Sequence, residues 1–178
     1  MRSEGATAAA DWRDEIFAAL KAADIRQVGY VPDAGHARLI ELCRADPDVR
    51  TVSLTTEEEG IALAAGAWLG GQRCALLMQS SGVGNCINML SLPKACRFPL
   101  TMLVTMRGEW AEFNPWQVAM GSKTQAALEL MDVLVYRAEQ ADDVAETVTA
   151  ALDIAFNGSL VTAVLLAQRL IGAKQWVK

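Results

Sequence analysis

The stretch Cys74-Ala-Leu-Leu-Met-Gln-Ser-Ser-Gly-Val-Gly-Asn-Cys-Ile-Asn88 indicates the fold class of this chain. A continuous apolar run leads into serines, glycines and an asparagine, after which a helical segment can begin. An uninterrupted apolar strand is typical of a parallel sheet whose two faces are both covered by helices. We therefore expect a buried strand over residues 74–78, a polar turn, and then a helix.

The same alternation continues along the chain. Helical periodicity over residues 11–22 places Ile16 and Leu20 on one face, and over 142–156 it places Val144, Val148, Leu152 and Phe156 on another. Asp143 and Glu146 are spaced to form a capping box. The expected strands are 28–31, 49–54, 74–78, 100–106, 133–136 and 160–167. We predict a single domain over residues 1–178, with a three-layer open parallel α/β sheet of about six strands and helices on both faces.

Composition excludes several classes of protein. The chain has 178 residues, is 52% hydrophobic, and carries 16 basic against 21 acidic residues, a net charge of −5. It is too apolar for a disordered chain and too acidic for general nucleic-acid binding. No apolar run is long enough to span a membrane, and residues 1–10 do not resemble a secretory signal. The four cysteines, which have no metal-ligand spacing, are expected to be reduced in a cytoplasmic protein.

In such sheets ligands bind at the carboxyl ends of the strands, so the residues that follow each strand are the candidates. After the first strand, Pro32 and Gly35 predict a fixed turn that carries Asp33 and the single histidine, His36. His36 could carry protons near neutral pH. From the residues alone, a helix-capping Asp33 and a solvated His36 are the favoured interpretation.

After the second strand come three glutamates, Glu57, Glu58 and Glu59, at a predicted helix amino terminus. The helix dipole favours negative charge there, which explains most of them structurally. The small residues over 62–67 would let a backbone or a flat ligand approach closely, and a carboxylate in such a place could exchange protons near neutrality. Helical phase does not identify which glutamate points inward.

Two further segments could bind an anion. The glycine-rich stretch 78–88 could form an anion site at a helix amino terminus, although a tight turn without a ligand explains it as well. Segment 107–121, long for a loop, begins with Arg107, which could bind an anionic group with two parallel hydrogen bonds, although an ordinary surface arginine is the commoner case. Its aromatic residues predict a surface for a partner, unless they fold back onto the core. They are Trp110, Phe113 and Trp116.

Together these stretches resemble the pyrimidine-binding domain of thiamine-diphosphate-dependent 2-oxoacid decarboxylases. Within that family the likeness is greatest to the decarboxylases of sulfopyruvate and phosphonopyruvate. The matching stretches, spread in order over most of the chain, are Val31-Pro-Asp33, Glu57 to Gly71, Met78 to Asn85, Arg107-Gly108 and Asn114 to Gly121. A glutamate lies nine residues before the glycine of the small-residue helix in this family, and 66 − 9 = 57 selects Glu57.

The resemblance implies roles for these residues. Glu57 would be the catalytic residue, bonded to N1′ of the cofactor's aminopyrimidine, where it promotes the imino tautomer that deprotonates the thiazolium carbon. Pro32, Gly82, Gly84 and Asn85 would also contact the cofactor. The residues near a small anionic 2-oxoacid would be Asp33, His36, Arg107 and Gln117.

The resemblance also implies a missing half. Family members hold Mg²⁺ and the cofactor's diphosphate through a Gly-Asp-Gly sequence and a following asparagine, and this chain contains no Gly-Asp-Gly. We therefore expect a hetero-oligomer in which a beta subunit supplies the metal ligands. The leading prediction is an alpha subunit that decarboxylates sulfopyruvate to sulfoacetaldehyde. The alternatives are another 2-oxoacid such as phosphonopyruvate, a non-catalytic subunit of the same fold, or a nucleotide-binding α/β protein.

Overall fold

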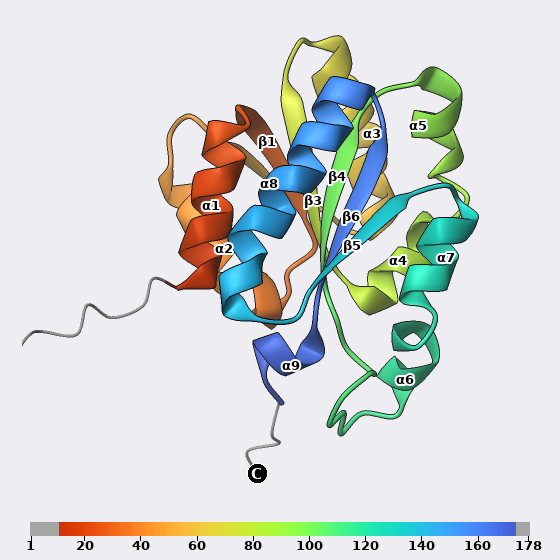
Figure 1. The fold of residues 1–178 in the computed structure, drawn as a ribbon. Helices are drawn as coiled ribbons and strands as arrows, with labels where there is room; N and C mark the ends of the chain where they lie inside the picture. Colours follow the sequence, from red (N-terminus) through yellow and green to blue (C-terminus); the bar gives the residue numbers. More distant parts are fainter. Residues whose placement is uncertain (1–10, 174–178) are drawn as a thin grey trace, which may run out of the picture.

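Six strands form one sheet in the order β2-β1-β3-β4-β6-β5, in a computed structural model that describes residues 11–173 (Figure 1). All neighbouring strands are parallel. The strands are β1 (Ile25–Tyr30), β2 (Arg50–Ser53), β3 (Arg73–Gln79), β4 (Leu100–Thr105), β5 (Leu134–Ala138) and β6 (Val161–Leu166). Each of them overlaps a strand predicted from the sequence, so the predicted fold class is confirmed.

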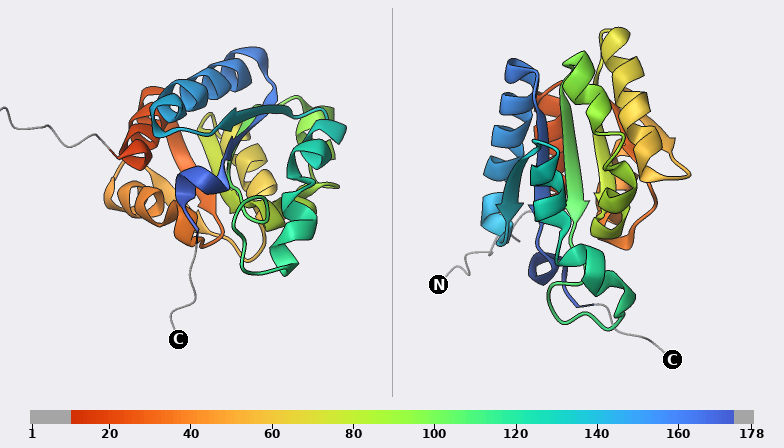
Figure 2. Two further views of the ribbon diagram at one scale, coloured as in Figure 1. Left: turned by 60° about the horizontal axis from the view of Figure 1, so that its bottom comes forward. Right: turned by 90° about the vertical axis from the view of Figure 1, so that its right-hand side faces the viewer.

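Helices cover both faces of this sheet (Figure 2). They are α1 (Trp12–Ala22), α2 (Ala37–Ala45), α3 (Glu57–Leu69), α4 (Ser80–Cys86), α5 (Ser91–Cys96), α6 (Trp116–Gly121), α7 (Thr124–Leu130), α8 (Ala141–Gly158) and α9 (Gln168–Ile171), with a 3-10 turn η1 (Ala34–His36). One core lies between the sheet and α1, α2 and α8, and the other lies beneath α3, α4 and α7. The predicted three layers are therefore present.

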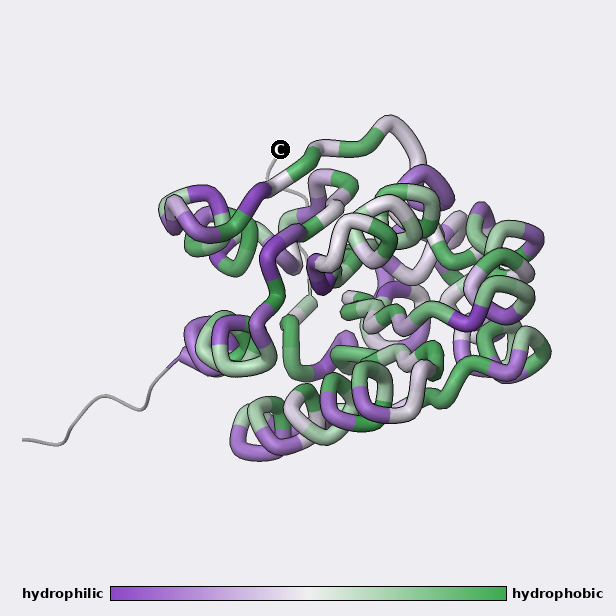
Figure 3. The backbone as a smooth tube through the Cα atoms, turned by 90° about the horizontal axis from the view of Figure 1, so that it is seen from above, coloured by the Kyte–Doolittle hydropathy of each residue, from purple (hydrophilic) through white to green (hydrophobic). Residues whose placement is uncertain are grey.

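The two cores follow from the alternation of side chains along buried strands. In β3, Leu77 belongs to the core under α1 and α8, whereas Leu76 belongs to the core under α3. The helices show hydrophilic and hydrophobic residues in turn around their axes, as expected for helices with one face on a core (Figure 3). The close contact of α3 with the sheet needs Gly60, because a Cβ there would lie 2.3 Å from Leu76.

Two predictions from the sequence concern helix α8. The stripe Val144, Val148, Leu152 and Phe156 is buried in α8, as predicted. The capping box of Asp143 with Glu146 is wrong, because α8 already begins at Ala141. Its N-cap is Gln140, which makes no side-chain capping bond, and the Asp143 N–H donates to the Gln140 carbonyl.

The described residues bear on three other predictions. Cys43, Cys74 and Cys86 are buried free thiols, and burial raises the pKa of each to about 12, whereas Cys96 is exposed. Within residues 11–173, no helix is long and apolar enough to cross a membrane. The prediction about a secretory signal in residues 1–10 lies outside the described residues.

The sheet order fixes where a ligand site is expected. The chain passes from β1 outward to β2, then crosses back to β3 on the other side of β1, so the connections reverse direction between β1 and β3. The crevice at such a reversal, beyond the carboxyl ends of the strands, is the common ligand site of open α/β sheets. In Figure 1 these ends lie at the bottom, near α9 and α6.

Candidate active site at the carboxyl end of the sheet

Glu57 is the first residue of α3, and it alone of the three glutamates there is buried, with 8% of its surface exposed. Glu59 is exposed and accepts a hydrogen bond from the Thr55 N–H, and Glu58 is half-buried. The Glu57 Oε2 atom accepts a hydrogen bond from Asn85 Nδ2 at 2.8 Å. Helical phase did not tell which of the three glutamates points inward; in the structure it is Glu57, the residue to which the family resemblance assigned the catalytic role.

Gly82 makes room for the Glu57 carboxylate. A Cβ built on Gly82 would lie 2.2 Å from both Cδ and Oε1 of Glu57, which no side chain could tolerate without displacing the carboxylate. Gly84, two residues further along α4, is exposed, and a Cβ there would lie 3.3 Å from Sδ of the flexible Met120. Glu57, Gly82 and Asn85, predicted together as cofactor contacts, are thus brought together, and Gly84 lies in the same helix.

The glycine-rich stretch itself is not a turn. Helix α4 begins at Ser80, directly after β3, so the predicted polar turn is wrong. Gly82, Gly84 and Asn85 are helical residues. Packing of α4 against α3, α6 and α7 supports a helix that its glycines alone would not favour.

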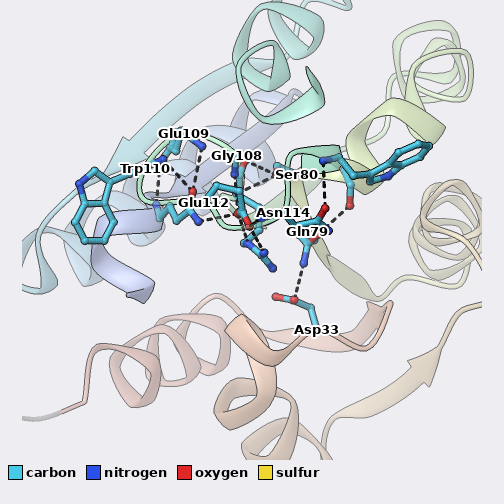
Figure 4. Close-up of polar contacts among 12 residues, drawn as sticks. Asp33, Gln79, Ser80, Gly108, Glu109, Trp110, Glu112 and Asn114 are labelled. Carbon is cyan, nitrogen blue, oxygen red and sulfur yellow. Dashed lines mark hydrogen bonds and ion pairs between the residues drawn. The ribbon is translucent and has the colours of Figure 1, made fainter. Parts of the chain in front are cut away.

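Asp33 caps the 3-10 turn after β1, as the residues alone suggested, because its Oδ2 accepts a hydrogen bond from the Gly35 N–H at 2.9 Å. The same carboxylate accepts hydrogen bonds from Thr105 Oγ1 at 2.7 Å and Gln79 Nε2 at 2.9 Å. These partners are the last residues of β4 and β3, and Figure 4 shows the contact of Asp33 with Gln79. Asp33 and Pro32 also line a hollow of about 420 Å³ beside α2.

His36 is buried, with 1% of its surface exposed, so the interpretation of a solvated histidine is wrong. Its Nε2 lies 3.0 Å from the Leu103 carbonyl in the middle of β4. Burial lowers the pKa of the ring, partly offset by the Asp33 carboxylate. A ring without exposed surface has no face for a substrate in this structure, and His36 is left out of the site proposed below.

Arg107 is also buried, which corrects the interpretation of an ordinary surface arginine. Its Nε and Nη2 donate to the two carboxylate oxygens of Glu112, at 2.6 and 2.5 Å. Hydrogen bonding from Arg107 is the main reason why the pKa of Glu112 falls to about 2. In turn Glu112, and more weakly Asp33, raise the pKa of the guanidinium.

Glu112 and Gln168 were not predicted as site residues, yet they organise the segment that follows β4 (Figure 4). Glu112 also accepts hydrogen bonds from the N–H groups of Gly108 and Asn114 and from Gln168 Nε2. The buried Gln168 Oε1 accepts from the N–H groups of Glu109 and Trp110. Gln168 begins α9, 56 residues after Glu112, and no local pattern could reveal this pairing.

The outer side of segment 107–121 is aromatic. Trp110, Phe113 and Trp116 are all exposed, Trp116 to 82%, so these rings do not fold back onto the core. Residues 116–121 form helix α6, which corrects the prediction of a loop throughout. Gln117, in α6, is half-buried, and its Oε1 atom is buried without a hydrogen-bond partner among the described residues.

Metal-ligating side chains do not gather in the described part of the chain. Within residues 11–173, no three His, Cys, Asp or Glu side chains lie close enough together to hold a metal ion. The polar groups at the carboxyl end are glutamates held by amides or by Arg107, and a network of neutral donors around Asp33. This arrangement can bind and orient an organic ligand through hydrogen bonds.

Comparisons with known proteins agree with this picture. The alpha subunit of sulfopyruvate decarboxylase from Methanothermobacter thermautotrophicus is 36% identical over 88% of this chain and 95% of its own length. The corresponding subunit from Methanococcus maripaludis is 31% identical over 86% of this chain and 92% of its own length. Phosphonopyruvate decarboxylase from Streptomyces viridochromogenes is 36% identical over 67% of this chain, which matches 30% of that longer enzyme. No protein-family model matches the sequence.

The fold has a solved counterpart. A chain of 2-oxoglutarate:ferredoxin oxidoreductase from Magnetococcus marinus superimposes with a TM-score of 0.69 over 94% of this chain and 33% of its own length, at 13% identity. The resemblance to the thiamine-diphosphate-dependent 2-oxoacid decarboxylases is confirmed, and the class of protein is a decarboxylase subunit. Within that class, the chain belongs to the family of the sulfopyruvate decarboxylase alpha subunits.

Proposed function

We propose that this chain is the alpha subunit of a thiamine-diphosphate-dependent decarboxylase that converts sulfopyruvate to sulfoacetaldehyde and CO2. The observation that carries the proposal is the Glu57 carboxylate, buried at the first turn of α3, held by Asn85 and fitted against Gly82. The relatives of this chain from Methanothermobacter thermautotrophicus and Methanococcus maripaludis are named sulfopyruvate decarboxylases. A phosphonopyruvate decarboxylase is the alternative, since an enzyme of that name also matches.

The residues around Glu57 fit an aminopyrimidine ring. Among residues 11–173, the side chain that donates a hydrogen bond to the carboxylate is that of Asn85, and it donates to Oε2 only. Oε1 has no hydrogen-bond donor among those residues and is thus available to a ligand nitrogen. Gly82 leaves the space that the Glu57 carboxylate fills, and the exposed Gly84 leaves backbone that a flat ring can approach.

When bound, thiamine diphosphate supplies the nucleophilic carbon and the electron sink that decarboxylation of a 2-oxoacid requires. The chain's own contribution is to hold a proton at N1′ of the pyrimidine with Glu57, while Asn85 fixes the orientation of the carboxylate. Burial of Glu57 keeps water from competing for this hydrogen bond. Pro32 and Asp33 follow β1 and line a hollow beside α2. Pro32 would contact the cofactor, and Asp33 would lie on the substrate side.

Mg²⁺ and the diphosphate would be held by a partner beta subunit, in a cytoplasmic hetero-oligomer. The described residues offer no three-ligand group for a metal. Hard Mg²⁺ needs carboxylate and phosphate oxygens in octahedral geometry. The relatives' designation as alpha subunits supports a partner, and the exposed aromatic residues of 107–121 offer a surface for one.

The test is a Glu57→Gln substitution in the complex of this chain with its partner subunit, compared with Glu59→Gln as a matched control in the same helical turn. We expect Glu57→Gln to lower CO2 release from sulfopyruvate at least 100-fold with the complex intact, as is typical for loss of a proton-transfer group (about 10²–10⁴-fold). Glu59→Gln should change the rate less than about twofold. Unchanged turnover in Glu57→Gln would contradict the catalytic role and favour a non-catalytic subunit.

A further inference from the structure

The hydrogen bonds of Arg107 use only one edge of its guanidinium. The group has five N–H donors in a planar fork. Glu112 takes the Nε–H and one Nη2–H, which is the side-on edge. Within residues 11–173, no group accepts a hydrogen bond from Nη1, so the end-on edge, formed by Nη1 and the second Nη2–H, is left over for another acceptor.

The position of this edge is fixed by its surroundings. The backbone N–H of Arg107 donates to Ser80 Oγ at 3.0 Å, which ties the end of β4 to the start of α4. The guanidinium carbon lies 5.5 Å from the centre of the Phe113 ring. Glu112 is itself fastened by Gly108, Asn114 and Gln168, and its side chain is only 4% exposed. The orientation of the guanidinium plane is therefore set by Glu112.

We propose that Glu112 is a positioning residue, which holds Arg107 side-on so that the end-on edge of the guanidinium binds the sulfonate group of the substrate. This inference rests on the proposed function and adds the residues that select the anionic end of the 2-oxoacid. A sulfonate or phosphonate offers two oxygens to the two parallel N–H groups of the end-on edge. Glu112 was in no predicted site, and Arg107 was predicted without this orientation.

The charges of Arg107 and Glu112 support this positioning role. A buried guanidinium without a counter-charge is costly, and Glu112 supplies that charge before substrate arrives. Because Glu112 leaves the end-on edge unused, the site does not have to break its own ion pair to accept an anion. A purely structural pair would also stabilise the segment, so the test must separate binding of the sulfonate from stability.

The test compares four forms of the complex with the partner subunit: wild type, Glu112→Gln, Arg107→Met, and the double variant. Each single variant leaves one buried charge without its partner, whereas the double variant contains neither charge. The double variant is therefore expected to fold even if a single variant does not. Glu139→Gln removes an exposed glutamate that pairs with Arg137, and it is the matched control. Two quantities are measured at pH 7: KM and kcat for sulfopyruvate, and the Kd of 3-sulfopropanoate, a probe with the same anionic ends but no keto group, by calorimetry.

We expect Glu112→Gln to raise KM and the probe Kd about tenfold or more, with kcat changed less than about threefold, since a charge-assisted hydrogen bond to the sulfonate is misplaced. Arg107→Met should raise both at least as much. In the Arg107→Met background, Glu112→Gln should add less than about twofold, because Glu112 acts through Arg107. Equal losses in both backgrounds, or a loss in kcat with KM and Kd unchanged, would overturn the inference.

The two proposals fail separately. A complex that decarboxylates sulfopyruvate, with KM and Kd insensitive to both residues, overturns the positioning role and leaves the proposed function standing. A complex that binds 3-sulfopropanoate through Arg107 and Glu112 but releases no CO2 overturns the proposed function and leaves the anion site standing. A complex that neither binds the probe nor turns over substrate overturns both.

Discussion

Two buried glutamates at the same end of the sheet are held in opposite ways. Glu57 has one side-chain donor, Asn85, and packs against Gly82, where a Cβ would collide with its carboxylate. Glu112 accepts from the Nε–H and one Nη2–H of Arg107, from two backbone N–H groups and from Gln168. A carboxylate with many donors is fixed as an anion, whereas one with a single donor keeps an oxygen for a ligand. This difference matches the roles proposed above, in which Glu112 positions Arg107 and Glu57 binds the ligand.

The sharpest test of this comparison is stability. Glu112→Gln leaves Arg107 buried without its counter-charge, and we expect a loss of about 3 kcal/mol in the free energy of unfolding at pH 7. Glu57→Gln removes no ion pair and should cost less than about 1 kcal/mol. Urea unfolding of the isolated chain gives both values. Equal losses would show that the two glutamates have the same structural role.

The stability that Glu112 contributes should also depend on pH. The pKa of Glu112 is about 2 in the folded chain, against 4.5 for the free group. Its stabilising contribution is therefore fully present above about pH 5 and is lost as the pH falls toward 2. Unfolding measured at steps between pH 6 and 2.5 should show a shallower acid loss in Glu112→Gln than in the wild-type chain. Parallel curves would contradict the depressed pKa.

A smaller effect is expected at the glycines of α4. Gly82→Ala forces a methyl group into the Glu57 carboxylate and should cost about 1–3 kcal/mol of stability, with a loss of turnover in the complex. Gly84→Ala, in the same helix, meets only Met120, and it should be neutral or stabilise by up to about 1 kcal/mol. Thermal unfolding of both variants measures the difference, and equal melting temperatures would rule out the close fit.

The smallest effect concerns His36. Burial lowers the pKa of its ring below the ordinary value of 6.5, so the unfolded chain binds a proton that the folded chain does not. Stability should therefore fall as the pH drops below about 6.5, by at most about 1.4 kcal/mol per pH unit. His36→Gln should flatten the stability curve between pH 7 and 5.5. An unchanged slope in that variant would show that His36 binds its proton as readily in the folded chain as in the unfolded chain, which contradicts the lowered pKa.

The sequence predicted the parts of this molecule whose signal is local. Continuous apolar runs such as 100–106 located the central strands, because burial on both faces leaves no polar alternation. Helix α4 was interpreted as a turn because its glycines and serines favour turns, whereas packing from three neighbouring helices decides its structure. Burial of His36 depends on Leu103, 67 residues away, and no pattern around the histidine reports that contact.

Some residues of the candidate site could be predicted from the sequence and others could not. Glu57 could be chosen only through the family resemblance, since three adjacent glutamates have the same helical surroundings in the sequence. Arg107 was noticed because it follows a strand, but its partner Glu112 lies within an irregular segment without periodicity. Gln168 was missed entirely, because its role depends on the meeting of β6 with the segment after β4.

The measurement that tests the central claim most directly is CO2 release from sulfopyruvate by this chain and its partner subunit, separately and mixed, with thiamine diphosphate and Mg²⁺. If the chain supplies only the Glu57 half of the active site, neither subunit alone will release CO2, and activity will rise with added partner until the subunits are matched. Turnover by this chain alone, or none in the mixture, would contradict the account.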